Sequence, residues 1–182
     1  MIERIVTEQV RAHLVECDLM PPVQSAYRQG HSTKTAVLNV ISVIIDAADS
    51  QEITLLGLLD MIAAFDTVDH KILLRRLEES FGVRGQALQW LSSFLTDRTQ
   101  AVAFAVSIST PQMLVCGIPQ GSILGPLLFV LYTYVLKIVA NHGVCIHAYA
   151  DDLQTYASCA ATDQQMATTR LLASVLDIAK WM

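Results

Sequence analysis

The fold of this chain is decided by one stretch, His147-Ala148-Tyr149-Ala150-Asp151-Asp152-Leu153-Gln154-Thr155-Tyr156. Positions 146, 148 and 150 are apolar and alternate with polar or aromatic neighbours, and a similar alternation follows the two acids. Such alternation is typical of β-strands. The stretch therefore predicts a β-hairpin with Asp151 and Asp152 at or beside its tip.

Two adjacent carboxylates have an electrostatic consequence. They repel each other, and each raises the proton affinity of the other unless a cation is present. A divalent ion removes this conflict, and oxygen-only ligands suit Mg²⁺. An ordinary solvated turn would also place Asp here, because Asp is a favoured turn residue. The hairpin alone leaves both interpretations open.

Composition narrows the class of protein. Of the 182 residues, 53% are hydrophobic and only 16% are charged. This predicts either a membrane protein or part of a larger protein whose apolar surface is normally covered. The net charge of −5 counts against a nucleic-acid partner, although a site that holds metal must itself be acidic.

The four cysteines form no Cys-x-x-Cys pair, and no secretory signal opens the chain. We therefore expect reduced thiols in an intracellular protein of the cytoplasm or nucleus. Cys145 and His147 have the spacing of two zinc ligands, but no second pair accompanies them. Buried structural residues are the favoured interpretation.

The first part of the chain predicts two helices. Residues 1–17 have amphipathic spacing, Pro21-Pro22 breaks the pattern, and Ser32 or Thr33 can cap a second helix over about residues 33–45. Arg28 lies in the polar passage between them. Its charge suits either solvated surface or contact with phosphate.

A continuous apolar run over residues 53–59 predicts a buried central strand that ends on Asp60. An acid at the end of such a strand lies on rigid scaffold. Helices are expected over residues 71–80 and 85–96. Residues 99–107 and 112–116 are strand candidates. The first range alternates in hydrophobicity, and Pro111 lies in the connection between the two.

Residues 123–140 are the most hydrophobic stretch and approach the length of a membrane span. Pro126 near the start, Lys137 in the second half and the lack of a basic flank favour a buried core helix instead. A last helix is expected from about Thr162 to the end of the chain.

This order of elements predicts an α+β fold without an internal domain boundary, built on a split βαβ antiparallel sheet with helices on one face. In such a sheet Asp60 lies beside the hairpin tip, so that Asp60, Asp151 and Asp152 converge. Three carboxylates at one edge suit two divalent ions, which can activate an attacking oxygen and stabilise a leaving one in phosphoryl chemistry.

Four segments, in this order, resemble the motifs of reverse transcriptases of the non-LTR (LINE-type) retrotransposon family. They are Gln24-Ser25-Ala26-Tyr27-Arg28-Gln29-Gly30-His31-Ser32-Thr33 (an upstream fingers motif), Leu58-Leu59-Asp60 with Ala63-Ala64-Phe65-Asp66-Thr67-Val68-Asp69-His70 (the first carboxylate motif), Gly117-Ile118-Pro119-Gln120-Gly121-Ser122-Ile123-Leu124-Gly125-Pro126-Leu127-Leu128-Phe129 (the PQGS segment) and Tyr149-Ala150-Asp151-Asp152 (the YADD box). Singly these motifs are weak or moderate signals, but together they are highly specific.

The resemblance implies a polymerase palm over about residues 53–182 and part of the fingers over about 1–52, with the thumb absent and the domain truncated at both ends. It implies an RNA-directed DNA polymerase core in which a primer 3′-hydroxyl attacks the α-phosphate of a deoxynucleotide. Little activity is expected of the fragment alone. The implied partners are an RNA template, a DNA primer, the dNTP and a chain that supplies a thumb, with no membrane.

The resemblance also implies residue roles. Asp60, Asp151 and Asp152 would hold two Mg²⁺ ions, for which Mn²⁺ could substitute, and the Met61 carbonyl would add an oxygen. The residues implied at the nucleotide are Phe65 (an aromatic gate against the 2′-hydroxyl), Asp66, Gln120, Gly121 (which lets backbone approach closely) and Arg28 (triphosphate or template).

The sequence departs from the family at two places. Met61-Ile62 stands where Leu-Ser is common, and Ala26-Tyr27-Arg28 replaces Gly-Phe-Arg. Two other classes of function stay open at this point. One is a non-catalytic folded remnant of a retroelement that acts at most as a binding module, and the other is a small membrane protein built on residues 123–140.

Overall fold

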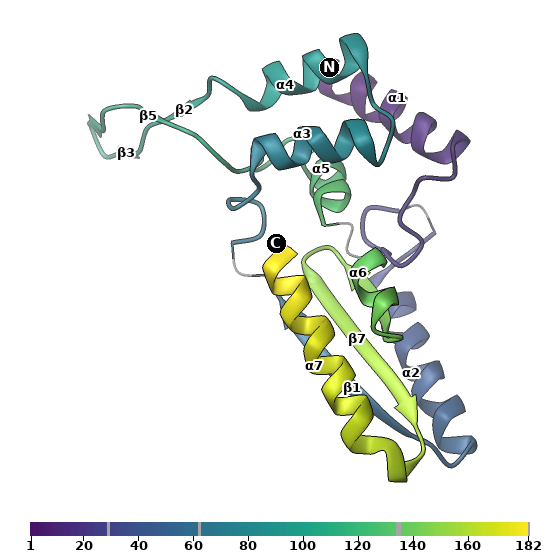
Figure 1. Ribbon diagram of the computed structural model, residues 1–182. Coiled ribbons are helices and arrows are strands. Elements are labelled where there is room, and N and C mark those ends of the chain that lie inside the picture. The colour runs from purple at the N-terminus through teal and green to yellow at the C-terminus, as the bar shows by residue number, and fades with distance from the viewer. Residues whose placement is uncertain (29, 62, 134–135, 182) are drawn as a thin grey trace. The chain divides into compact units, whose positions relative to one another are not determined.

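The computed structural model describes residues 1–28, 30–61, 63–133 and 136–181. The chain folds into two compact units (Figure 1). The first unit comprises Met1–Met20 and Ala63–Tyr132, and the second unit comprises Pro21–Ile62 and Thr133–Met182. Each unit is thus made of two segments that are distant in sequence.

The second unit is built on a three-stranded antiparallel sheet in the order β1-β7-β6. Its strands are β1 (Ile53–Asp60), β6 (Cys145–Tyr149) and β7 (Asp152–Cys159). The predicted hairpin is confirmed as the β6–β7 pair, in which Tyr149 lies opposite Asp152. Ala150 and Asp151 form the two-residue turn between the strands. Asp152 is therefore the first residue of β7, directly beside the tip.

Helices cover both faces of this sheet. They are α2 (Thr33–Asp49), α6 (Leu136–Asn141) and α7 (Gln164–Trp181), with a short 3₁₀ turn η1 (Ala161–Asp163) before α7. On the α7 face, a Cβ added to Gly57 would lie 3.7 Å from Leu171. On the opposite face, Asn39 of α2 contacts the His147 ring. The α+β class is confirmed. The prediction of helices on one face only is wrong, because α2 covers the second face of the sheet.

The core of the second unit lies between the sheet, α6 and α7. Its buried members are Val139, Val144, Ile146, Ala148, Leu153 and Ile178, with Leu59, Met61, Leu171 and Trp181 packed against them. The even-numbered residues of β6 point into this core, as the alternation predicted. Ser32 caps α2, since its hydroxyl accepts a hydrogen bond from the Thr35 amide, and this expectation is also confirmed.

The first unit is helical. It contains α1 (Ile2–Glu16), α3 (His70–Glu79), α4 (Gly85–Leu95) and α5 (Gly125–Tyr132). Asp69 caps α3 by accepting a hydrogen bond from the Ile72 amide. The fully buried large side chains of this unit are Leu14, Val68, Leu73, Leu77, Phe81, Leu91, Leu95, Leu124, Leu128, Phe129 and Leu131. Three of these helices, α1, α3 and α4, begin and end within two residues of the sequence prediction.

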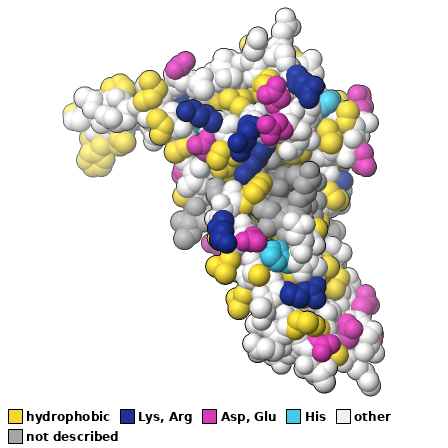
Figure 2. Space-filling view, viewed as in Figure 1, with side chains coloured by type: hydrophobic (Ala, Val, Ile, Leu, Met, Phe, Trp, Pro, Cys, Tyr) yellow, Lys and Arg dark blue, Asp and Glu magenta, His cyan; other side chains and the backbone are white. Residues whose placement is uncertain are grey.

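The prediction of two continuous strands over residues 99–107 and 112–116 is wrong. This arm instead forms two short ladders, β2 (Thr99–Gln100) with β5 (Gln112–Met113) and β3 (Ala103–Phe104) with β4 (Ser107–Ile108). The alternating apolar side chains face solvent, and Phe104 is 81% exposed. Figure 2 shows hydrophobic side chains on the surface of this arm. An alternating pattern favours a long strand only when one face has a core to cover it.

The single helix predicted over residues 123–140 is also wrong, because α5 and α6 are separate. Pro126 fits the first turn of α5, where its missing N–H costs nothing. Arg76 donates a hydrogen bond to the Tyr132 carbonyl at the other end of α5. Residues 134 and 135 lie outside the described part of the chain. Among the described helices, none is both long enough and apolar enough to cross a membrane.

Candidate active site

Three acids lie at one end of the sheet in the second unit. Asp60 is the last residue of β1 and is directly opposite Asp152, the first residue of β7. Side chains of such cross-strand partners project from the same face, with Cβ atoms roughly 4.5–5.5 Å apart. Asp151 precedes Asp152 in the turn. We call Asp60, Asp151 and Asp152 the carboxylate edge.

The carboxylate edge is open to ligands. Asp60 and Asp152 are exposed and Asp151 is half-buried. Within the described residues, none of the three carboxylates accepts a hydrogen bond or joins an ion pair. An all-oxygen set of this kind matches the preference of Mg²⁺. However, the described residues include no group of three or more His, Cys, Asp or Glu side chains already close enough to hold a metal ion. The three acids match a divalent ion in donor chemistry, and their side chains would have to rotate toward one another to hold it.

Tyr27 lies near enough to Asp151 to be affected by its charge; it is half-exposed and has a φ of +57°. Burial raises the pKa of the Tyr27 hydroxyl, and the negative charge of Asp151 raises it further. Tyr27 thus stays protonated beside the acid. The neighbouring Arg28 donates a hydrogen bond of 3.4 Å to the Pro21 carbonyl, so its guanidinium is partly engaged by its own loop.

Two buried polar side chains of the second unit support this end of the sheet and were not among the predicted site residues. The expectation of a buried structural residue is confirmed for His147 and is wrong for Cys145, which is exposed. His147 is 6% exposed and lies between the Ser25 hydroxyl (3.1 Å) and the Asn39 amide (3.2 Å). Gln24 is 5% exposed and reaches the backbone of Ala150. The sequence signals for His147 were its alternation with apolar neighbours and its spacing from Cys145. Gln24 sits in a polar loop and carried no periodic signal.

The predicted nucleotide-site residues Phe65, Asp66, Gln120 and Gly121 lie in the first unit. They are carried by two chain segments that are joined by hydrogen bonds. The Ile118 amide donates to the Phe65 carbonyl and the Gly117 amide to the Val68 carbonyl, both at 2.8 Å. His70 Nε2 donates to the Gly117 carbonyl at 2.7 Å, which assigns the proton to Nε2. Gly117 has a φ of +92°, and a Cβ there would lie 3.1 Å from the Asp66 carbonyl oxygen. Only glycine suits both conditions.

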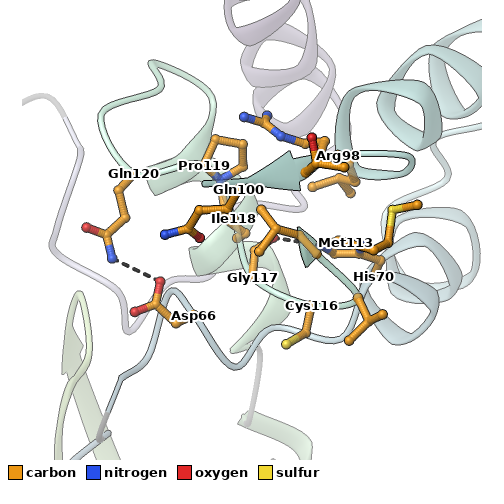
Figure 3. Close-up of a pocket in the computed structure, with 14 residues that line it drawn as sticks. Asp66, His70, Arg98, Gln100, Met113, Cys116, Gly117, Ile118, Pro119 and Gln120 are labelled. Carbon is orange, nitrogen blue, oxygen red and sulfur yellow. Dashed lines mark hydrogen bonds between the residues drawn. The ribbon is translucent and has the colours of Figure 1, made fainter. Parts of the chain in front are cut away.

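This junction brings Asp66 and Gln120 together. Gln120 Nε2 donates a 2.9 Å hydrogen bond to the Asp66 carboxylate, and Figure 3 shows the two side chains facing each other. Phe65 is half-buried, and its ring stacks on buried Phe129 with centroids 4.6 Å apart. Gly121 has a φ of +79° with open space where a Cβ would be. Four of these residues, Phe65, Asp66, Gln120 and Gly121, were predicted separately from sequence, and a direct hydrogen bond joins two of them, Asp66 and Gln120.

A groove of about 660 Å³ runs beside this junction within the first unit. Its lining includes polar side chains from the arm and from the two bonded segments (Figure 3), among them Asp66, His70, Arg98, Gln100 and Gln120. Convergent polar groups in a concave site are typical of ligand binding.

Met61 lies in the second unit, where its side chain packs against the core, and Ile62 lies outside the described residues.

Comparison with known proteins gives a consistent picture. A family described as "Reverse transcriptase (RNA-dependent DNA polymerase)" matches residues 1–182. The probable RNA-directed DNA polymerase from transposon BS of Drosophila melanogaster is 34% identical over 157 residues, covering 83% of this chain and 17% of that protein. The polymerase of the X-element of the same species is 34% identical over 156 residues, again 17% of its length. That from mobile element jockey of Drosophila funebris is 28% identical over 159 residues. The chain thus spans about a sixth of these relatives.

Among solved structures, the apo telomerase of Candida tropicalis, truncated from the C-terminal domain, has a similar fold. The TM-score is 0.62 with 14% identity, and the match covers 97% of this chain and 36% of that protein. At this identity the likeness concerns the fold alone.

Proposed function

The chain belongs to the reverse transcriptase (RNA-dependent DNA polymerase) family, and on that premise we propose that it forms the carboxylate-bearing core of an RNA-directed DNA polymerase. In this reaction a primer 3′-hydroxyl loses its proton and attacks the α-phosphate of a dNTP, a new phosphodiester bond forms, and pyrophosphate leaves. RNA template, DNA primer and dNTP are the substrates. A further chain or segment supplies the thumb, and the protein acts inside the cell.

The observation that carries this proposal is the pairing of Asp60 with Asp152 across the sheet, with Asp151 next to it in the turn. The hairpin and the sheet hold the backbone of all three acids, so only side-chain rotation is needed to bring their carboxylates together. Two Mg²⁺ ions, or Mn²⁺ in their place, would be held here with help from the Met61 carbonyl. When bound, such ions polarise a phosphate and lower the pKa of a hydroxyl.

The residues of the first unit serve the nucleotide in this proposal. Gln120 is oriented by its bond to Asp66, which leaves its amide oxygen free to accept from a base or sugar. Phe65 is held in place by its stack on Phe129 and excludes a 2′-hydroxyl. Gly121 presents backbone without a side chain in the way. Arg28 has the least support, because its guanidinium already contacts the Pro21 carbonyl.

Metal binding by the carboxylate edge is the sharpest test. Mn²⁺ binding to the purified chain can be measured by electron paramagnetic resonance for the wild type, Asp60→Asn and Asp151→Asn. The control is Asp163→Asn, which removes an exposed carboxylate of η1 in the same unit. We expect each edge variant to bind Mn²⁺ at least roughly ten-fold more weakly and the control to match the wild type. Equal affinities in all four proteins would refute the assignment.

A further inference from the structure

The turn that carries Asp151 has an unusual backbone. Ala150 has a φ of +55°, in the left-handed region that non-glycine residues seldom adopt. It is also only 9% exposed. Its amide and carbonyl lie beyond the last β6–β7 pair, Tyr149 with Asp152, so the strand ladder does not satisfy them. Buried backbone groups of this kind need another partner.

The side chain of Gln24 is that partner. Its Oε1 accepts a hydrogen bond from the Ala150 amide at 3.0 Å, and its Nε2 donates to the Ala150 carbonyl at 3.2 Å. The side-chain amide of Gln24 thus bonds both the N–H and the C=O of Ala150, which fixes the peptide planes on either side of Ala150. Oε1 also accepts from the Ala26 amide at 2.9 Å, which holds the Gln24 side chain itself in place.

The backbone of Gln24 is anchored to the same sheet. Residue 24 forms a parallel bridge with Ala148. The Ala148 amide donates to the Val23 carbonyl and the Ser25 amide donates to the Ala148 carbonyl, each at 2.9 Å. The segment is therefore an additional edge beside β6, and the Gln24 side chain extends along that edge to the turn. The side-chain contact of Gln24 with Ala150 joins residues 126 apart in sequence.

We propose that Gln24 is a positioning residue, whose amide holds Ala150 in the left-handed conformation and thereby orients the carboxylates of Asp151 and Asp152. The assignment rests on the proposed role of these acids in metal binding. The side-chain hydrogen bonds of Gln24 in the described structure go to Ala150 and Ala26, so in this proposal it acts on the acids through the backbone of Ala150. Leucine at position 24 keeps the volume and loses all three side-chain hydrogen bonds, two to Ala150 and one to Ala26. Ser25→Ala disturbs the same segment through its bond to His147 and leaves the bonds to Ala150 in place.

The first measurement is independent of metal. Amide hydrogen exchange of Ala150 in Gln24→Leu should be at least ten-fold faster than in the wild type, since its amide loses its acceptor. Ser25→Ala should leave this rate within about two-fold of the wild type. Unchanged protection of Ala150 in Gln24→Leu would overturn the proposal whatever the carboxylates do.

The second measurement separates orientation from general packing. Mn²⁺ affinity should fall roughly ten-fold in Gln24→Leu, the size of effect typical for groups that orient metal ligands. Glycine adopts positive φ readily, so Gln24→Leu with Ala150→Gly should recover part of that loss. Loss of affinity without recovery would show that Gln24 only packs the segment, and would overturn the positioning role. If the wild type itself binds no Mn²⁺, the metal role of the acids fails, while the exchange rates still decide whether Gln24 holds Ala150.

Discussion

At the scale of single residues, His147 shows how a buried polar side chain becomes a pH-sensitive element of the second unit. The Asn39 amide nitrogen can only donate, so His147 Nδ1 accepts, and Nε2 then carries the proton toward Ser25. Burial lowers the pKa of His147, and the nearby positive charge of His31 lowers it further. The neutral ring is thus the form that the fold stabilises.

The sign of the resulting pH dependence follows. The pKa of His147 is lower in the folded than in the unfolded chain, where it is about 6.5. Its contribution to the free energy of unfolding is therefore fully present above about pH 6.5 and is lost as the pH falls through the folded pKa. Urea titrations at several pH values should show a smaller loss of stability on acidification for His147→Gln than for the wild type. Parallel curves for the two proteins would assign the acid sensitivity to other groups.

A second residue-scale prediction concerns Phe65 in a full-length polymerase that contains this chain. Phe65→Ala should increase incorporation of ribonucleotides relative to deoxynucleotides, because the smaller side chain leaves room for the 2′-hydroxyl. Loss of the stack on Phe129 should also cost about 2 kcal/mol of stability, less than the roughly 3–5 kcal/mol of a fully buried Phe.

The matched control is Phe94→Ala. Phe94 is another half-buried ring of the first unit, and it stacks on Trp90 with centroids 5.6 Å apart. It should lose stability to a similar extent without any change in the ratio of ribo- to deoxynucleotide incorporation. If Phe65→Ala leaves that ratio unchanged as well, Phe65 is a packing residue only.

At the scale of elements, sequence periodicity predicted α1, α2, α3, α4, α7 and the β6–β7 hairpin. It also located β1, but the expectation of a buried central strand is wrong, because β1 is an edge strand of the sheet and Leu58 is 70% exposed. Periodicity failed where tertiary context decides. The arm over residues 99–113 has strand-like alternation but no core beneath it, and Val106 is fully exposed. Residues 123–140 are apolar on every side, so periodicity could not reveal where α5 ends and α6 begins.

The junction between the two segments of the first unit yields an element-scale prediction. Gly117→Ala should destabilise the protein strongly, because its Cβ would meet the Asp66 backbone at 3.1 Å in addition to the strain of positive φ. Gly121→Ala should cost only the conformational strain, about 1–2 kcal/mol, since a Cβ there meets open space. Thermal unfolding of the two variants compares these effects. Equal losses of stability in the two variants would mean that the close approach of Gly117 to the Asp66 backbone adds no cost of its own.

At the scale of the whole molecule, the predictable part of the candidate site was the part built on neighbouring strands. Asp60 and Asp152 could be paired from sequence because a strand-end acid and a hairpin tip meet whenever the strands are adjacent. The bond between Gln120 and Asp66 and the contact of Gln24 with Ala150 depend on where irregular loops lie. Loops carry no periodicity, so the supporting residues could not be predicted although the acids could.

The surface charge of the molecule bears on its activity in isolation. The net charge is −5, and on the face that Figure 2 shows, acidic side chains lie among the Lys and Arg side chains. Binding of a nucleic-acid backbone depends on clustered cations and weakens steeply with salt. Apolar side chains are also bare, with Leu58 70% and Phe104 81% exposed. Such surface favours aggregation unless a partner covers it.

We therefore expect the 182 residues alone to give little or no primer extension, although Asp60, Asp151 and Asp152 are all present. Holding primer, template and nucleotide in line contributes roughly 7–11 kcal/mol to such a reaction, and this chain corresponds to only 17% of the length of the polymerases from transposon BS and the X-element. Even if the three acids bind metal, the reaction needs a primer whose 3′-hydroxyl is held in line with the α-phosphate. The measurement is extension of a DNA primer on an RNA template with Mg²⁺, beside an Asp151→Ala control. Robust extension that the control abolishes would show that the chain itself holds the primer and template.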